Sequence, residues 1–340
     1  MEIRTLGTLV VRDSSHIAAA RRLATGIARS LGFDEPEIAK IAIVVTEAVT
    51  NVVRYAKEGE IVVNSLPGET APAMAFIVLD KGPGIANISE ALRDGHSTSG
   101  GAGTGLGAIT RIASKFEIYS MPGEGTALLL VAGKPAGPRP GAPSAGGISV
   151  PYPGEEVCGD AWTLRRAGTR LQLLVVDGLG HGLDAAEAAR AAVAAFNSAP
   201  FEAAGGVAGL LDTIHAALRG TRGAVAAVAD IDPDSGRLAY AGIGNISAVI
   251  ATPEREHDLI SHPGTLGAGI VSVRPLMYEW PPGAVLVMHS DGLSRRWRLD
   301  ERPALLGRDA NLIAGVLYRD HRRERDDATI AVVKDGRPLR

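Results

Sequence analysis

The sequence predicts an α+β protein of two domains, and three observations carry this prediction. Its 340 residues are enough for about two ordinary domains. A stretch rich in proline and glycine, residues 133–147, interrupts the chain near its middle. Helical and strand patterns alternate before this stretch, whereas strands predominate after it. We therefore expect domains at residues 1–132 and 148–335, joined by a linker over residues 133–147.

The first domain reads as an α/β sandwich, with helices on one face of a mixed sheet. Apolar residues at helical spacing predict helices over residues 14–31 and 35–56, and a further helix fits residues 105–115. Asp34 is a suitable N-cap for the second helix, and Pro36 falls in its first turn. Strands are predicted at residues 60–64, 74–80, 116–119 and 126–131.

The stretch over residues 133–147 is expected to hold no regular structure. Its prolines remove backbone donors, and its glycines add backbone freedom. The alternative is a long loop inside one domain, but structureless stretches of this length are uncommon in compact domains. A linker is therefore the favoured interpretation.

The second domain reads as a β-sandwich flanked by helices. Asp232-Pro-Asp-Ser-Gly236 is a hairpin-turn sequence between two predicted strands. Helices fit residues 184–197 and 206–218. The predicted strands cover residues 161–165, 171–177, 224–231, 238–243, 247–251, 284–289 and 328–334. This pattern favours two antiparallel sheets with the helices outside them.

The composition excludes several classes of function. The formal net charge of −3 gives no basic field for nucleic acid or an anionic membrane. No apolar run approaches the roughly 18 residues that span a bilayer, and residues 1–5 lack a signal-peptide pattern. Cys158 is the only cysteine, so an internal disulfide is impossible. We expect a cytoplasmic protein that binds neither nucleic acid nor membrane. Nothing in the sequence indicates its oligomeric state.

Two polar residues on the second predicted helix suit nucleotide chemistry. Glu47 and Asn51 are four residues apart and therefore share one face of the helix. An Asn can ligate a Mg²⁺ that bridges phosphates, and a Glu can accept the proton of an attacking hydroxyl. Taken alone, the pair is better explained by a solvated polar face.

The strand over residues 74–80 ends in Asp80-Lys-Gly82-Pro-Gly84. A carboxylate just past a buried strand can accept a hydrogen bond from an exocyclic amine such as that of adenine. The two glycines allow a ring to approach the backbone closely. A simple turn is the alternative.

A glycine-rich segment over residues 94–107 leads into the third predicted helix. Glycines before a helix N-terminus form a ready cradle for phosphate. The segment also fits the degenerate dinucleotide-binding fingerprint, but no buried strand precedes it, so that context fails. No Gly-Lys-Ser/Thr of the Walker type occurs in the chain.

Together, the Glu47/Asn51 pair, the Asp80–Gly84 motif and the glycine-rich segment resemble the motifs of the GHKL ATPase/kinase superfamily. More narrowly, they resemble those of the RsbT-type switch kinases, and the likeness covers roughly residues 1–133. Such kinases use ATP and Mg²⁺ and phosphorylate a serine or threonine of a STAS-domain antagonist protein. No phosphoacceptor histidine helix precedes the domain, which argues against a two-component histidine kinase. The resemblance implies that Glu47 is the base, Asn51 the Mg²⁺ ligand and Asp80 the adenine reader. It further implies an ATP-binding set of Gly82, Gly84, Gly103, Thr104, Gly105, Leu106, Gly107 and Thr126.

The second half carries aspartates at the ends of its predicted strands. They are Asp160, Asp177, Asp291, Asp326 and Asp327. Carboxylate oxygens suit Mg²⁺ or Mn²⁺, and a metal pair can activate water and neutralise an attacked phosphate. Each Asp motif alone is also explained by a turn or a solvated loop. Three Asp-containing strand ends with apolar lead-ins favour the metal site.

This half resembles the metal-dependent type 2C protein phosphatases, specifically the SpoIIE/RsbX branch, over about residues 147–334. The motifs at residues 242–245 and 262–267 add to the likeness. The resemblance implies two Mn²⁺ or Mg²⁺ ions bridged by Asp177 with the Gly178 carbonyl. It implies that Asp291 and Asp326 complete the second metal site, with Asp327 ranked behind them, and that Asp160 orients the attacking water.

These observations predict a bifunctional partner-switching regulator of a stress or sigma-factor type module. One domain would phosphorylate a STAS-domain antagonist or scaffold protein, and the other would hydrolyse the phosphoserine or phosphothreonine. One alternative is a phosphatase gated by a kinase-like domain that only binds nucleotide or a partner. Another is a non-enzymatic binding regulator. Cys158 is expected to pack as a small buried residue, while His181 and His289 are possible phosphate neighbours.

Overall fold

The computed structural model describes residues 3–68, 71–92, 105–137, 141–269 and 273–337. Its contacts divide the chain into two compact units, Met1–Gly137 and Pro138–Arg340. The division falls inside the stretch that was expected to be a linker. Each unit is described by itself below.

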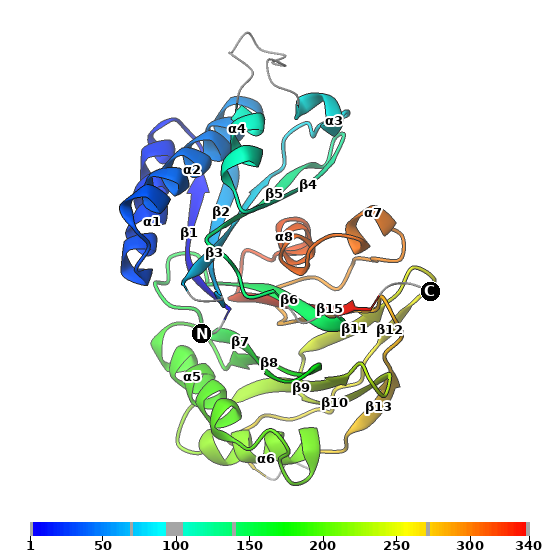
Figure 1. Cartoon of the computed structure of the whole chain (residues 1–340). Helices are drawn as coiled ribbons and strands as arrows, with labels where there is room; N and C mark the ends of the chain where they lie inside the picture. The colour runs from blue at the N-terminus through cyan, green and yellow to red at the C-terminus, as the bar shows by residue number, and fades with distance from the viewer. Residues whose placement is uncertain (1–2, 69–70, 93–104, 138–140, 270–272, 338–340) are drawn as a thin grey trace. The chain divides into compact units, whose positions relative to one another are not determined.

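The N-terminal unit is one five-stranded sheet with helices against one face (Figure 1). Its strand order is β1-β2-β3-β5-β4, and every pairing is antiparallel. The expectation of a mixed sheet is therefore wrong. The pairs β2–β3 and β4–β5 are consecutive in sequence and joined by short connections, which makes them antiparallel, and β5 also pairs antiparallel with β3. The elements are β1 (Arg4–Val11), α1 (Ser15–Leu31), α2 (Glu35–Tyr55), β2 (Gly59–Leu66), β3 (Ala73–Asp80), α3 (Ile88–Ala91), α4 (Gly105–Ile112), β4 (Lys115–Met121) and β5 (Gly125–Ala132).

Helix α2 begins as its sequence predicts. Asp34 accepts a hydrogen bond from the Glu37 N–H at 2.8 Å, and the Glu37 carboxylate accepts one from the Asp34 N–H at 3.4 Å. This reciprocal capping box satisfies two N–H groups that the helix itself leaves unpaired. The buried stripe of α2 packs toward the sheet and comprises Ile38, Ile41, Val45, Val49 and Val52. Strand β1 escaped prediction because it is a partly exposed edge strand.

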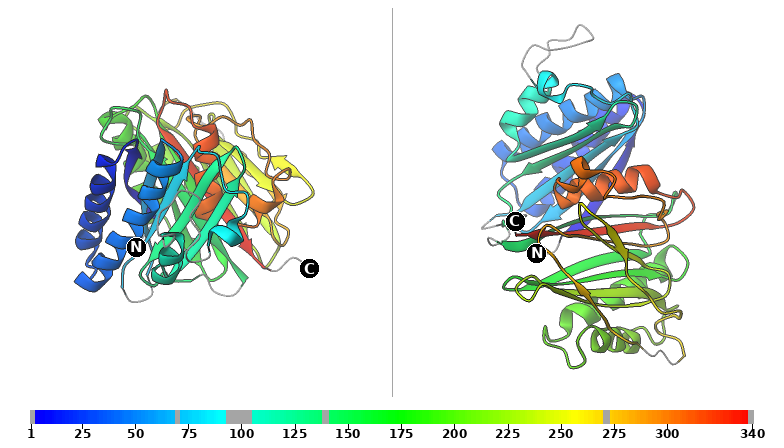
Figure 2. Two further views of the ribbon diagram at one scale, coloured as in Figure 1. Left: turned by 90° about the horizontal axis from the view of Figure 1, so that it is seen from above. Right: turned by 90° about the vertical axis from the view of Figure 1, so that its right-hand side faces the viewer.

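The C-terminal unit is a sandwich of two five-stranded sheets with helices outside, as predicted. One sheet has the order β13-β10-β9-β8-β7 and carries α5 and α6, whereas the other has the order β12-β11-β14-β15-β6 and carries α8 (Figures 1 and 2). The elements are β6 (Gly141–Val150), β7 (Asp160–Ala167), β8 (Arg170–Gly178), α5 (Leu183–Ser198), α6 (Gly206–Ala217), β9 (Ala224–Asp232), β10 (Arg237–Ile243), β11 (Ser247–Ala251), β12 (Glu256–Asp258), β13 (Leu276–Glu279), β14 (Val285–His289), α7 (Pro303–Leu306), α8 (Ala310–His321) and β15 (Ala328–Gly336).

Strand β6 corrects the prediction of a linker over residues 133–147. Residues 141–147 pair antiparallel with β15 at the edge of its sheet. Pro143 is tolerated there because an edge strand does not use every backbone donor. A Cβ built on Gly146 would lie 2.5 Å from the Asn311 backbone nitrogen, and one on Gly147 would lie 2.6 Å from the Trp162 ring. These glycines serve close packing, although their composition resembles that of a flexible tether.

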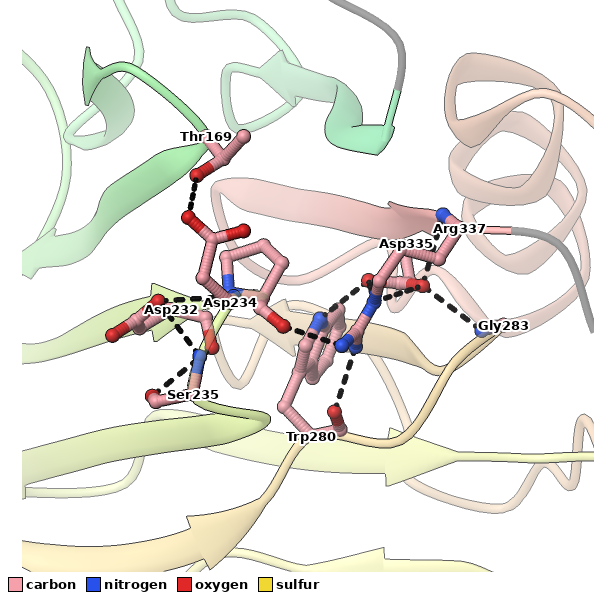
Figure 3. Close-up of polar contacts among 9 residues, drawn as sticks. Thr169, Asp232, Asp234, Ser235, Trp280, Gly283, Asp335 and Arg337 are labelled. Carbon is pink, nitrogen blue, oxygen red and sulfur yellow. Dashed lines mark hydrogen bonds and ion pairs between the residues drawn. The ribbon is translucent and has the colours of Figure 1, made fainter.

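Two polar clusters hold the β9–β10 turn and the end of β15 in place (Figure 3). In the predicted β9–β10 turn, the Asp232 carboxylate accepts hydrogen bonds from the backbone N–H groups of residues 234 and 235, at 3.1 and 3.2 Å. Beside it, the buried Asp335 carboxylate accepts from the Trp280 indole N–H at 2.9 Å and from the Arg337 Nε at 3.1 Å. The turn prediction is confirmed, and the Asp335 cluster anchors the end of β15.

Among the residues that the structure describes, no helix is both long and apolar enough to span a bilayer.

Substituting Gly146 distinguishes a packed strand from a linker. We expect Gly146→Ala to lower the free energy of unfolding of the C-terminal unit by about 1–3 kcal/mol, because the new methyl group meets the backbone of α8. Urea denaturation followed by tryptophan fluorescence measures the loss. Gly137→Ala is the matched control, since nothing lies within 4 Å of its Cβ position, and should change stability by less than about 0.5 kcal/mol. Equal stability of the two variants would contradict the packed strand.

Candidate functional site

The C-terminal unit has a cavity of about 610 Å³ at the ends of its strands. Three of the predicted aspartates, Asp177, Asp291 and Asp326, line this cavity although they are far apart in sequence. They come from the end of β8, the turn after β14 and the segment before β15. The other lining residues are Leu179, Gly180, His181, Val225, Gly244, Asn245, Pro263, Gly264 and Arg325.

Asp160 and Asp177 face one another across two antiparallel strands, since they are direct partners in the β7–β8 register. Burial raises the pKa of Asp177 to about 7, with help from the negative charges of Asp291 and Asp326. Burial and the neighbouring Asp177 also raise the pKa of Asp160 well above its usual range. The fold therefore holds carboxyl groups together where their ionisation is unfavourable, which is the electrostatic signature of a functional site.

Ser290 holds Asp160 in place and is a residue that the sequence did not single out. Its hydroxyl donates to the Asp160 carboxylate at 2.5 Å and accepts from the Thr329 N–H at 3.0 Å. Both Ser290 and Asp160 are buried. The only signal in the sequence is that Ser290 directly precedes Asp291, just after the last residue of β14.

Asp291 is oriented by an amide. The Asn245 side chain donates to the Asp291 carboxylate at 2.8 Å from the turn between β10 and β11. Burial and the charge of Asp326 raise the pKa of Asp291, while the guanidinium of Arg323 opposes this shift. The motif over residues 242–245 thus contributes a positioning group to the cavity.

Asp327 lies outside the cavity lining, although its negative charge also raises the pKa of Asp160 and Asp177. Its carboxylate is buried, does not line the cavity, and accepts a hydrogen bond from the Tyr152 N–H at 2.8 Å. The other oxygen, Oδ2, has no hydrogen-bond partner among the described residues and would lie 2.7 Å from a Cβ on Gly159. Asp327 therefore ties down the segment between β6 and β7, and its place as a second-ranked metal ligand stays a prediction.

Gly178 follows Asp177 at a point where only glycine fits. Its N–H donates to the Gly159 carbonyl at 3.1 Å, and an added Cβ would lie 2.3 Å from the Ala185 carbonyl oxygen on α5. This close packing sets the path of the backbone that leaves β8. The expected use of the Gly178 carbonyl as a metal ligand stays a prediction.

The donor set suits a divalent cation in its chemistry. The cavity presents carboxylate oxygens from three separate segments, and burial together with the neighbouring carboxylate charges raises the pKa values of Asp177 and Asp291, a repulsion that a bound cation would relieve. Within the described ranges, no group of three or more His, Cys, Asp or Glu side chains is arranged closely enough to enclose an ion. Metal binding would therefore require the carboxylates to draw inward around the ion.

The remaining candidates of this unit fall into different places. His181 lines the cavity, where its Nδ1 lies 2.8 Å from the Glu155 carboxylate and its ring stacks on Tyr152. His289 is buried outside the cavity lining, and burial lowers its pKa to about 4. Cys158 is half-buried, so the expected buried position is met only in part, and burial raises the pKa of its thiol.

In the N-terminal unit, the predicted nucleotide residues occupy α2 and the end of β3. Glu47 and Asn51 lie one helical turn apart on α2 and are both partly exposed, while the stripe that faces the sheet is buried. Helix α4, which carries the last glycine box, packs against α2.

Asp80 is held at the end of β3 by two backbone donors. Its Oδ1 accepts from the Gly82 N–H at 2.8 Å and from the Thr126 N–H at 3.2 Å. Thr126 pairs with Asp80 in the β3–β5 register, and its hydroxyl lies 3.0 Å from that of Ser120. Gly84 has a φ of 72° and would place a Cβ 2.1 Å from the Met121 carbonyl oxygen. The segment after β3 therefore packs closely against the neighbouring backbone, and the expected approach of an adenine ring to its glycines stays a prediction.

The glycine-rich phosphate cradle is described only in part. Gly103 and Thr104 lie outside the described residues, and Gly105 is the first residue of α4. Leu106 packs against the core of the unit, and Gly107 is buried. The phosphate-binding role of these residues stays a prediction.

Comparison with known families gives a match for each half of the chain. The Stage II sporulation protein E (SpoIIE) model matches residues 167–337. The histidine kinase-like ATPase domain model matches residues 10–132.

Two curated relatives, both from Bacillus subtilis (strain 168), match the same two halves. Serine/threonine-protein kinase RsbT is 37% identical over 110 residues, which is 32% of this chain and 83% of RsbT. Phosphoserine phosphatase RsbX is 25% identical over 146 residues, which is 42% of this chain and 70% of RsbX.

Two solved structures are also similar. One comes from work on the bacterial stressosome, described there as a modular system that has been adapted to control secondary messenger signaling. It aligns with a TM-score of 0.52 and 30% identity, covering 56% of this chain and 98% of that chain. The crystal structure of RsbX in complex with magnesium aligns with a TM-score of 0.51 and 20% identity, covering 57% of this chain and 95% of that one. The second likeness shows the fold of the C-terminal unit.

The raised pKa of Asp177 predicts that divalent cations bind this cavity in competition with protons. Because the carboxyl titrates near pH 7 in the free protein, a proton must leave before a cation is held below that pH. We expect Mn²⁺ affinity to be about tenfold weaker at pH 6 than at pH 8, and to level off above pH 8.

Isothermal titration calorimetry in buffers of different ionisation enthalpy measures both the affinity and the protons released. Asp212→Asn, which alters an exposed carboxylate on α6, is the control and should leave the profile unchanged. If Mn²⁺ binds at pH 6 without releasing a proton, the cation does not displace the proton of Asp177, and the prediction is wrong.

Proposed function

Because the chain belongs to the Stage II sporulation protein E family through residues 167–337, and carries a histidine kinase-like ATPase domain ahead of it, we propose a bifunctional regulator. Its C-terminal domain hydrolyses a phosphoserine or phosphothreonine of a partner protein. Its N-terminal domain phosphorylates such a residue with ATP. The partner is a STAS-domain antagonist or scaffold protein of a partner-switching module.

The observation that carries the phosphatase proposal is the cavity lined by Asp177, Asp291 and Asp326. These three carboxylates would hold Mn²⁺ or Mg²⁺, with the Gly178 carbonyl as a further oxygen ligand. Bound divalent cations supply positive charge that activates water and stabilises the developing charge on the phosphate. The chain's own contribution is to bring the carboxylates together and to fix each one before the substrate arrives.

Asp160 has a separate task in this proposal. It is buried behind Asp177 and is fixed by the Ser290 hydroxyl, so it faces the cavity-lining carboxylate from the adjacent strand. A carboxyl with a raised pKa in this place can hold or accept the proton of the attacking water. The pairing of Asp160 with Ser290 therefore supports its assignment as the residue that orients water.

The kinase proposal rests on Glu47, Asn51 and Asp80. Glu47 would accept the proton of the substrate hydroxyl, and Asn51 would ligate the Mg²⁺ that accompanies ATP. Asp80, held by two backbone N–H groups, would accept from the adenine amine, with Gly82, Gly84 and Thr126 shaping the pocket. Phosphoryl transfer needs mainly positioning and charge neutralisation, which this set can supply.

The choice of partner rests on the two relatives together. One half of the chain is similar to a serine/threonine-protein kinase and the other to a phosphoserine phosphatase, and both relatives come from the same organism. The similar stressosome structure supports a place in signalling of that kind. We infer that the two domains act in opposite directions on one class of protein.

Two substitutions separate the activities. With [γ-³²P]ATP, Mg²⁺ and a purified STAS-domain partner, we expect Glu47→Gln to reduce labelling about 100-fold or more, because the general base is lost. We expect Asp177→Asn to leave labelling intact and to make the label persist. Removal of label from prelabelled partner in the presence of Mn²⁺ measures the reverse reaction.

Glu35→Gln is the matched control, since it alters an exposed carboxylate in the first turn of the same helix as Glu47. If Asp177→Asn never yields labelled partner while the intact chain removes label, the chain is a phosphatase gated by a nucleotide-binding domain. If neither labelling nor removal occurs with the intact chain, the chain acts by binding alone.

A further inference from the structure

The carboxylates that line the proposed phosphatase cavity would repel the phosphate group of a substrate. A phosphoserine or phosphothreonine carries a charge of about −1.5 to −2 near neutral pH. The cavity is lined by three aspartates, so a phosphate that enters it needs cationic donors besides any metal ions. Among the described residues that line this cavity, Arg325 is the only Arg or Lys.

Arg325 is free to serve a ligand. Its side chain is exposed and makes no hydrogen bond or ion pair within the described part of the chain, although Asp291 and Asp326 line the same cavity. Two other arginines of this unit, by contrast, pair with carboxylates. Arg170 pairs with Asp230 at 2.7 Å, and Arg222 pairs with Asp184 at 2.7 Å. An arginine that merely balanced the aspartates would be expected to pair with one of them.

The backbone that carries Arg325 is fixed on both sides of it. On the α8 side, the Arg323 N–H donates to the Gly292 carbonyl at 2.8 Å, next to Asp291. On the β15 side, Asp327 accepts from the Tyr152 N–H at 2.8 Å and donates its own N–H to Asp326 at 2.9 Å. The segment between α8 and β15 therefore presents a flexible guanidinium from an anchored position, where the orange helix leads into the red strand (Figure 1).

The other basic side chains near the cavity are less available. His181 is engaged by Glu155 at 2.8 Å and by the ring of Tyr152. Arg323 lines only the neighbouring hollow, with Asp291 and Asp326, and lies close enough to Asp291 to favour its charged form. Arg325 lines both hollows, so it is the guanidinium that can reach between them.

We propose that Arg325 is the phosphate-recognition residue of the phosphatase site, donating to two non-bridging oxygens of the substrate phosphoryl group. The planar guanidinium can make two parallel N–H···O bonds to a phosphate, which a lysine ammonium cannot. This inference rests on the proposed phosphatase function and adds the group that recognises the phosphate. It assigns to Arg325 substrate binding and not the holding of the metal ions.

Steady-state kinetics with p-nitrophenyl phosphate and Mn²⁺ test the assignment. We expect Arg325→Ala to raise KM about 10- to 100-fold, the loss expected for hydrogen bonds to a charged group. The inhibition constant of inorganic phosphate should rise by a similar factor. Arg325→Lys should recover part of the loss, because a lysine restores the positive charge but not the pair of parallel N–H donors. Mn²⁺ affinity, measured separately by calorimetry, should stay within about twofold of the unsubstituted chain, a loss below about 0.5 kcal/mol.

Two arginines serve as controls. Arg296→Ala alters an exposed arginine outside the cavity lining and should leave both constants unchanged. Arg323→Ala alters the guanidinium of the neighbouring hollow and should have a smaller effect than Arg325→Ala.

The outcomes distinguish the inference from the function on which it rests. If the unsubstituted chain does not hydrolyse phosphate esters with Mn²⁺, the proposed phosphatase function fails. If it does, and Arg325→Ala keeps KM and the phosphate inhibition constant, the assignment of Arg325 alone fails. The assignment is also overturned if Mn²⁺ affinity falls in parallel with KM, or if Arg323→Ala has the larger effect.

Discussion

The C-terminal domain is organised around the repulsion between carboxylates gathered at one end of its sandwich. Asp160 and Asp177 are cross-strand partners, and Asp291 and Asp326 add their charge from other segments. The cost of holding them together is reflected in the raised pKa values of Asp160, Asp177 and Asp291. Ser290, Asn245 and the packing around Gly178 resist that repulsion. Much of the local structure is thus a framework for a cluster that would otherwise spread apart.

The sequence allowed the fold class, most elements and the cavity-lining aspartates to be predicted. Asp177 and Asp291 follow buried apolar strands, and such strands carry a strong pattern. The sequence did not indicate Ser290 or the part that Asn245 plays in orienting Asp291, because a side chain that orients another is defined by a three-dimensional contact and has no fixed spacing. Helix α8 was also missed, although Asp309 caps it through the Asn311 N–H at 2.8 Å. Its residues are buried on nearly all sides, so no polar face marks it as amphipathic.

The error at residues 141–147 has a different cause. Glycine permits two opposite situations, a chain that is free and a chain that is too crowded for a side chain. Gly146 and Gly147 belong to the second, since Asn311 and Trp162 occupy the space next to them. Composition alone does not separate these cases. Ile148 and Val150, which continue the same strand into the core, were the better indication.

The extent of β6 shortens the connection between the two units of the chain. On one side, the Ala136 N–H donates to the Pro67 carbonyl at 2.7 Å, and on the other, Gly141 already pairs with Gly336. From Gly137 to Gly141 the chain can extend by about 14 Å at most. A short connection of this kind permits little independent diffusion of the two domains. Under the proposed function, a partner released by one domain would stay near the other, and the balance of its modification would depend on the relative turnover of the two sites more than on encounter.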